Sequence, residues 1–68
     1  MMNGLVIRRG EYYLARKGTK SARPDASGNF WSKELQAARV FSDYNAACRA
    51  AKQHGGVVRI MKDGRAEE

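Results

Sequence analysis

Residues 42–61, SDYNAACRAAKQHGGVVRIM, predict a helix followed directly by a strand. Residues 43–54 are rich in alanine, with Ser42 as a good N-cap and Asp43 in the first turn, where a negative charge suits the helix dipole. We expect Gly55 to end the helix, because glycine readily adopts the left-handed conformation found after the last turn. Four side chains at helical spacing are expected to face the core: Tyr44, Ala47, Cys48 and Ala51.

Short β-branched segments on either side of this helix predict strands. Residues 57–61, VVRIM, are expected to form the last strand and residues 5–8, LVIR, the first. A tight turn at Arg9-Gly10 would lead from the first strand into a second one at residues 11–16, since a two-residue connection with glycine fits a β-hairpin. The chain is therefore expected to open with a hairpin.

The middle of the chain has weaker periodicity. Residues 17–29 contain glycine, serine and proline without an apolar period, and they predict a long loop. Residues 35–39 fit either a helix or a strand, and a strand through residues 38–41 is favoured because the helix that follows requires a break. Trp31 is expected to lie mainly in the core. Residues 64–68 are expected to form a frayed C-terminal tail.

This order of elements predicts one α+β domain over residues 1–68. We expect a small, mainly antiparallel sheet in the order β-β-β-α-β, with one helix packed on one face. The sequence offers no other element to cover the opposite face. That face is therefore expected to be an exposed binding surface that carries Arg8, Arg59 and one of the tyrosines Tyr12 and Tyr13.

Length, cysteine content and hydropathy indicate a small cytoplasmic protein. A chain of 68 residues with the single cysteine Cys48 makes no internal disulfide and has room for a modest core. Only three consecutive large apolar residues precede Arg8, and no run of about 20 apolar residues follows, so we expect neither a signal peptide nor a membrane span. A monomer or homodimer without membrane contact is expected, in the host cell cytoplasm if the protein is encoded by a phage.

Positive charge is concentrated in the first third of the chain. The formal net charge is +6, from 13 Lys and Arg against 7 Asp and Glu. Six basic residues and one acidic residue lie before residue 25, so this segment contributes +5. Arginine and lysine contact phosphates, while tyrosine stacks on unpaired bases or anchors protein interfaces. The residues expected to bind a partner are Arg8, Arg9, Tyr12, Tyr13, Arg16, Lys17, Lys20 and Arg23.

The side chains that carry catalysis and bind metals are scarce in this sequence. Cys48 and His54 lie roughly 120° apart around the predicted helix, too far apart for a nucleophile and its base. Two such residues are also too few for a tetrahedral zinc site, and the seven carboxylates are scattered. We therefore expect a protein that is not an enzyme, with no catalytic residue, no cofactor and no metal.

A pattern of short motifs is shared with a known group of small proteins. It comprises Tyr12-Tyr13-Leu14, Phe30-Trp31, residues 38–42, Ala46-Ala47 in the helix and residues 57–60. In this pattern and in size, the chain resembles phage- and mobile-element-encoded proteins, including anti-CRISPR inhibitors with one helix on a small antiparallel sheet. The resemblance implies a protein-binding inhibitor or modulator that blocks a host nucleoprotein complex, meeting an acidic protein surface with its basic hairpin and loop. The alternative is an accessory or regulatory protein that binds nucleic acid directly.

Overall fold

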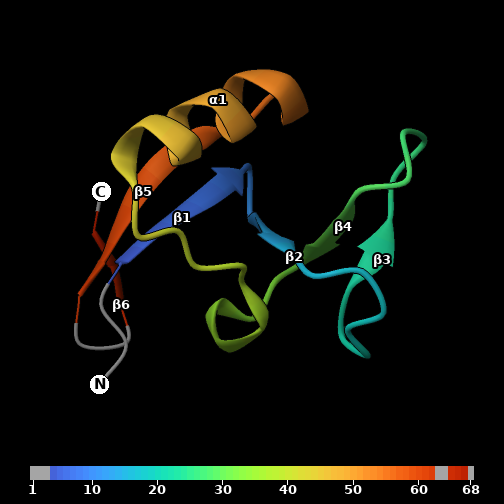
Figure 1. Ribbon diagram of the computed structural model, residues 1–68. Coiled ribbons are helices and arrows are strands. Elements are labelled where there is room, and N and C mark those ends of the chain that lie inside the picture. The colour runs from blue at the N-terminus through green and yellow to red at the C-terminus, as the bar shows by residue number, and fades with distance from the viewer. Residues whose placement is uncertain (1–3, 63–64, 68) are drawn as a thin grey trace.

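A computed structural model describes residues 4–62 and 65–67 of the chain. In these residues the elements are β1 (Gly4–Arg9), β2 (Tyr12–Ala15), β3 (Arg23–Pro24), β4 (Phe30–Ser32), the 3-10 turn η1 (Leu35–Ala37), α1 (Tyr44–His54), β5 (Val57–Lys62) and β6 (Arg65–Glu67). The strands form one antiparallel sheet in the order β3-β4-β2-β1-β5-β6. α1 lies on one face of the sheet over β1 and β5 (Figure 1), so the predicted α+β fold is confirmed.

β1 and β2 form the predicted hairpin, with the turn one residue further along the chain. Arg9 belongs to β1 and pairs with Tyr12, so the two-residue turn is Gly10-Glu11 and the predicted turn at Arg9-Gly10 is wrong. Gly10 has a φ of +62°, in the left-handed region that glycine adopts without a steric penalty. Because Arg9 continues the strand, its side chain lies next to that of Tyr12 on the same face of the sheet.

α1 ends where the sequence predicts and begins one residue later. Asp43, and not Ser42, is the N-cap, because its carboxylate accepts a hydrogen bond of 3.0 Å from the backbone N–H two residues on. Gly55 ends the helix with a φ of +78°. Gly56 then allows β5 to start against β1, since a Cβ atom on Gly56 would lie 2.6 Å from Cγ2 of Ile7.

Small side chains bring α1 close to the sheet. Ala47 and Ala51 are buried as predicted, and Ala50 also packs against the core. The predicted stripe is wrong at Tyr44, which is 63% exposed because it lies in the first turn, at the margin of the packed face. Cys48 is half-buried.

β1 is buried on both of its faces. On the helix side, Ile7 packs in a cluster with Leu14, Trp31 and Ala51. On the opposite side, Val6 packs in a second cluster with Ala38 and Met61. Trp31 is only 5% exposed, so its predicted place in the core is confirmed.

The sheet face opposite α1 is partly covered, and the expectation of an open face is wrong there. Figure 1 shows η1 and the segment after it on the side of the sheet away from α1. Leu35 and Val40 pack against the cluster of Val6 and Met61. The irregular segment between β4 and α1 therefore covers the apolar side chains of this face, as a second helix would in a larger domain.

Residues 38–41 do not form the predicted strand. Ala38 makes an isolated antiparallel bridge to Ala15, and Phe41 makes another to Leu5. The segment runs beside two different strands in turn, so neither ladder grows long enough to make it a strand. Residues 35–39 were predicted to be either a helix or a strand. In the structure residues 35–37 form the single 3-10 turn η1.

Three further strands lie outside the predicted ones. β4 pairs with β2, and the two-residue β3 pairs with β4, so the predicted loop at residues 17–29 contains a short strand. β6 pairs with β5, so the predicted frayed tail at residues 64–68 is wrong for residues 65–67, and residues 64 and 68 lie outside the described residues. No helix in the described part of the chain has the length and apolar character needed to cross a membrane.

Candidate functional site

The register of the hairpin divides the predicted contact residues between the two faces of the sheet. Arg9 is paired with Tyr12, and Arg8 is paired with Tyr13. Side chains alternate along a strand, so the first pair lies on the face that carries α1 and the second pair lies on the opposite face. The eight residues predicted to bind a partner therefore do not form one continuous surface.

The pair on the face away from α1 is tied into the fold. Arg8 Nε donates a hydrogen bond of 2.7 Å to the Gly10 carbonyl, and its guanidinium lies 5.9 Å from the centre of the Tyr13 ring. Tyr13 itself packs against the cluster that includes Met61. Arg59, which was expected on this face, lies there opposite Val6 and is partly buried. Arg8 and Tyr13 are therefore engaged within the fold, whereas the buried Nε of Arg59 has no hydrogen-bond partner among the described residues.

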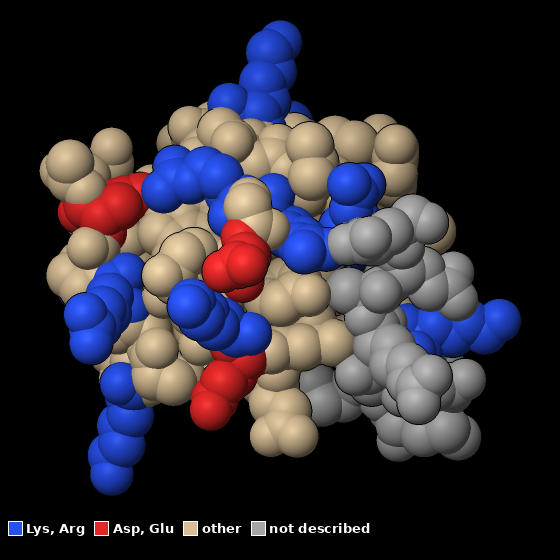
Figure 2. Space-filling model, turned by 180° about the vertical axis from the view of Figure 1, so that it is seen from behind, with Lys and Arg blue, Asp and Glu red and all other residues tan. Residues whose placement is uncertain are grey.

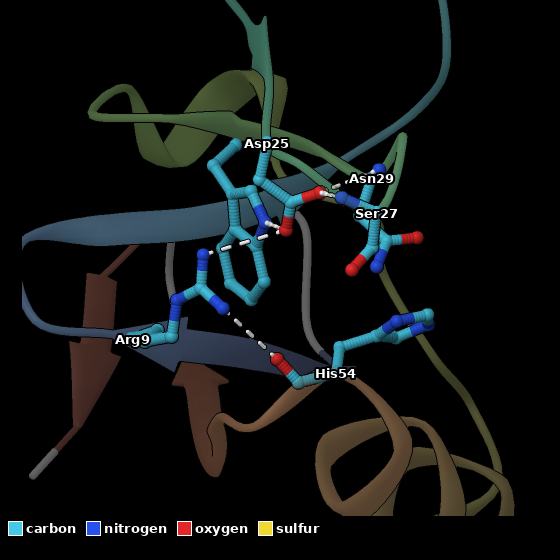
Figure 3. Close-up of polar contacts among 6 residues, drawn as sticks. Arg9, Asp25, Ser27, Asn29 and His54 are labelled. Atoms are coloured by element: carbon cyan, nitrogen blue, oxygen red, sulfur yellow. Dashed lines mark hydrogen bonds and ion pairs between the residues drawn. The ribbon is translucent and has the colours of Figure 1, made fainter.

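Arg9 connects the hairpin, the loop before β4 and the end of α1. Its guanidinium donates hydrogen bonds to the His54 carbonyl at 3.2 Å and to Asp25 Oδ2 at 3.4 Å. The same guanidinium lies 4.2 Å from the centre of the Trp31 ring. Figure 3 shows Arg9 between Asp25 and the end of the helix. Arg9 is therefore engaged within the protein and positions its neighbours, although it was predicted to bind a partner.

Asp25 organises the loop that leads into β4. Its Oδ1 accepts the backbone N–H groups of Ser27 and Asn29, both at 2.9 Å, and its Oδ2 accepts Trp31 Nε1 at 2.9 Å (Figure 3). The hydrogen bond from Trp31 is the largest cause of a lowered pKa for Asp25. The two backbone N–H groups and the charge of Arg9 lower this pKa further, against a partial desolvation that raises it.

A hollow lies beside this network, and we call it the Tyr12 surface. The side chains that matter for its chemistry are Tyr12, Ser21, Arg23, Trp31, Lys33 and Glu34. Its volume is about 440 Å³. A smaller hollow of about 210 Å³ adjoins it, shares Tyr12, Arg23 and Trp31, and extends to Arg9 and Asp25. The two hollows lie on the same face of the sheet as α1, over the part of that face that α1 does not cover.

Tyr12 is the exposed aromatic side chain of this surface. Its residue is 43% exposed, whereas the neighbouring Trp31 is buried. Lys33 Nζ lies 5.5 Å from the centre of the Tyr12 ring and 3.9 Å from a carboxylate oxygen of Glu11. Both charged side chains are well exposed, so this ion pair is weak and its members are free to move. The arrangement offers a flat ring with cations at its rim.

The remaining predicted cations lie elsewhere. Arg16 and Lys17 line a separate hollow at the end of β2, together with Arg39. Lys20 is exposed and lines neither this hollow nor the Tyr12 surface. Of the eight predicted residues, only Tyr12 and Arg23 thus line the hollow of the Tyr12 surface, with Arg9 in the adjoining one.

Lys33 and Arg39 are cations of these hollows that the sequence prediction missed. Both follow residue 24, outside the segment in which the excess charge is concentrated. Trp31 and Lys33 are two residues apart, so a strand at residues 30–32 would have placed them on the same face. The signal for Lys33 therefore existed, but it depended on predicting β4.

Basic side chains also occur on the side of the molecule away from the viewer of Figure 1. Figure 2 shows Lys and Arg spread over that side, with Asp and Glu among them. Positive charge by itself therefore does not mark one site. Among residues 4–62 and 65–67, no three His, Cys, Asp or Glu side chains are grouped so as to hold a metal ion.

Comparisons with protein families, curated proteins and solved structures found no match to this chain. The assignment of a function therefore depends on the geometry of the chain itself. Its distinctive part is the Tyr12 surface, where an exposed ring, a buried tryptophan and several cations meet beside a fixed loop.

Proposed function

We propose that the chain is a non-enzymatic binding protein that holds single-stranded nucleic acid on the Tyr12 surface. The observation that carries this proposal is the exposed Tyr12 ring in a hollow with Arg23 and Lys33 at its rim. An unpaired base stacks on an aromatic ring, and the cations beside the ring bind the phosphates on either side of that base.

The shape of the surface favours a single strand over a duplex. A duplex hides the faces of its bases inside the stack, so Tyr12 would have nothing to stack on. Lys33 covers the ring in the free protein, and its exposed side chain would move from the ring to a phosphate when a base arrives. The guanidinium of Arg9 lies over the Trp31 ring, and this contact fixes the Trp31 side chain that lines the hollow.

Replacement of the ring tests this proposal. The Tyr12→Leu variant should bind a short single-stranded oligonucleotide roughly 5- to 150-fold more weakly, because stacking contributes about 1–3 kcal/mol per base. Tyr44→Leu is the matched control, since Tyr44 is 63% exposed on α1 and does not line the hollow. Fluorescence anisotropy at about 50 mM salt measures the affinity, with circular dichroism to verify that both variants fold.

Three outcomes of this experiment are informative. Weaker binding of Tyr12→Leu alone, with log affinity falling by roughly 0.7 per phosphate contact against log salt, supports the proposal. Equal losses for Tyr12→Leu and Tyr44→Leu contradict it. Absence of binding at about 50 mM salt to single-stranded DNA and RNA also contradicts it, because phosphate contacts are strongest at low salt.

A second candidate function is supported by exposed apolar side chains away from the Tyr12 surface. Val57 is 50% exposed and Ile60 is 54% exposed, both on β5. Val57 is paired with Arg8 on the face away from α1, and arginine is enriched at protein interfaces, whereas Ile60 lies on the other face. This candidate is the inhibitor or modulator of a host nucleoprotein complex, meeting an acidic protein surface. It fails if the immobilised chain retains no protein from a nuclease-treated host lysate.

A further inference from the structure

A second hollow, which we call the basic hollow, lies where β2 ends beside the last turn of α1. Its volume is about 520 Å³, within the range of small-molecule sites. Its polar side chains come from four separate segments, and Leu14 contributes an apolar wall. The polar ones are Arg16, Lys17, Asn29, Arg39 and His54.

No carboxylate of the described residues neutralises the charge of the basic hollow. Arg16, Lys17 and Arg39 line it, and no Asp or Glu of the described residues does. None of these three cations forms an ion pair with another described residue. Three like charges brought together without a counter-charge repel one another, and a bound anion would relieve that repulsion.

The walls of the basic hollow are held by the fold. The guanidinium of Arg39 lies 4.9 Å from the centre of the Phe41 ring, and the Arg39 backbone N–H donates to the Leu14 carbonyl at 2.8 Å. On the other wall, Asn29 is anchored to Asp25, because its N–H donates to Oδ1 at 2.9 Å and its carbonyl accepts the Asp25 N–H at 2.7 Å.

The turn that carries the other two cations is also fixed. The Arg16 carbonyl accepts hydrogen bonds from the backbone N–H of Thr19 at 3.2 Å and from Thr19 Oγ1 at 2.7 Å. This turn fixes the backbone that carries Arg16 and Lys17. All three cations are exposed, and Arg39 differs from Arg16 and Lys17 in that its guanidinium lies over the Phe41 ring.

We propose that the basic hollow binds a phosphate group, in a nucleotide or in a nucleic-acid backbone. Arg39 would give planar, paired N–H donors to two phosphate oxygens, which is the geometry that suits arginine. Lys17 and Arg16 add charge from the opposite side, and the Asn29 amide and the His54 ring add hydrogen-bond donors. A cationic ligand would find no carboxylate of the described residues here.

This site is distinct from the Tyr12 surface and does not depend on it. The two share no lining residue. They are linked through Arg9, which contacts Trp31 on one side and the carbonyl of His54 on the other. A single strand on the Tyr12 surface would bring phosphates toward the basic hollow, but a free nucleotide could occupy the hollow alone.

Amide chemical shifts in a ¹H–¹⁵N spectrum test the proposal. The probes are inorganic pyrophosphate, a mononucleotide and a short single-stranded oligonucleotide, each titrated at about 50 mM salt. We compare the wild type with Arg16→Gln/Lys17→Gln. The matched control is Arg49→Gln/Lys52→Gln, which removes the same charge from two exposed positions on α1.

We expect shifts centred on residues 16–17, 28–29 and 39. The Arg16→Gln/Lys17→Gln variant should bind at least tenfold more weakly, while the control keeps the wild-type affinity. Binding of pyrophosphate or the mononucleotide indicates a free phosphorylated ligand, and binding of the oligonucleotide alone indicates a backbone phosphate.

The proposal is wrong if none of the three probes shifts these amides, or if the control loses as much affinity as the test variant. If Arg16→Gln/Lys17→Gln fails to fold by circular dichroism, Lys17→Gln with Lys52→Gln as its control decides the matter, since Lys17 is exposed and bound to no described residue. The Tyr12→Leu variant should bind pyrophosphate normally, which separates this site from the Tyr12 surface.

Discussion

At the scale of single residues, the side chain of Asp25 joins three parts of the fold. Its two oxygens accept hydrogen bonds from Ser27, Asn29 and Trp31, and its charge faces Arg9. These partners belong to the loop, to β4 and to β1. One carboxylate thereby fixes the floor of the Tyr12 surface and one wall of the basic hollow.

Asparagine at position 25 should destabilise the protein. Asp25→Asn keeps the shape of the side chain, but its amide N–H₂ would face donors from Trp31 and Arg9 in place of an acceptor. We expect a lower midpoint of thermal unfolding and altered Trp31 fluorescence. Asp43→Asn is the control, because asparagine caps a helix as well as aspartate does. Equal midpoints for both variants would contradict this role.

The same carboxylate makes stability depend on pH. Because the folded state lowers the pKa of Asp25 below its unfolded value, the charged form stabilises the fold above about pH 4. That contribution is lost as the pH falls through the folded-state pKa, when the carboxylate takes up a proton. We therefore expect the difference in unfolding midpoint between wild type and Asp25→Asn to shrink between about pH 5 and pH 2. A difference that stays constant over that range would exclude this explanation.

At the scale of elements, the sequence predicted those elements that depend on neighbouring residues. It did not predict those that depend on contacts between segments far apart in the chain. The helix and the hairpin were predictable because caps, alanines and a glycine turn act over a few residues. β4 was missed because three residues carry no period, and its strand character comes from pairing with β2. The cover formed by Leu35 and Val40 is also set by the sheet beneath it.

The residues of the candidate sites were likewise predictable only where local sequence determines their place. Tyr12 and Arg23 were predicted from composition, since aromatic and basic residues are concentrated before residue 25. Arg8 and Tyr13 lie on the face away from α1 because the hairpin turn is at Gly10-Glu11. The turn was predicted one residue earlier, so this pairing was not predicted. Arg39 was missed because its place beside β2 results from contacts between segments far apart in sequence.

The close start of β5 leads to a prediction about Gly56. A Cβ atom there would lie 2.6 Å from Cγ2 of Ile7 and 3.0 Å from the Arg8 carbonyl, so Gly56→Ala should force the strands apart. We expect a loss of about 1–3 kcal/mol in the free energy of unfolding, as for other overpacked sites. Gly18→Ala is the comparison, because a Cβ atom at Gly18 would meet nothing within 4 Å and would strain only the backbone. Urea denaturation measures both, and a smaller loss for Gly56→Ala than for Gly18→Ala would contradict the close approach.

At the scale of the whole molecule, two small clusters share one strand. Ile7 faces the cluster under α1, and Val6, the residue before it, faces the cluster under η1. A chain of this length is expected to have a free energy of unfolding of about 3–10 kcal/mol. Neither cluster is large enough to hold the sheet alone, so the fold requires both at once.

This shared strand predicts that the two clusters unfold together. Met61→Ala removes a side chain that is 2% exposed from the cluster opposite α1, and it should cost about 2–5 kcal/mol. Trp31 lies in the other cluster, yet its fluorescence midpoint in urea should fall by as much as the circular dichroism midpoint. Ile60→Ala, at an exposed neighbour in β5, should change both by little. If Met61→Ala moves the circular dichroism but leaves the Trp31 fluorescence unchanged, the clusters unfold separately, and the cover over the second face is an independent unit.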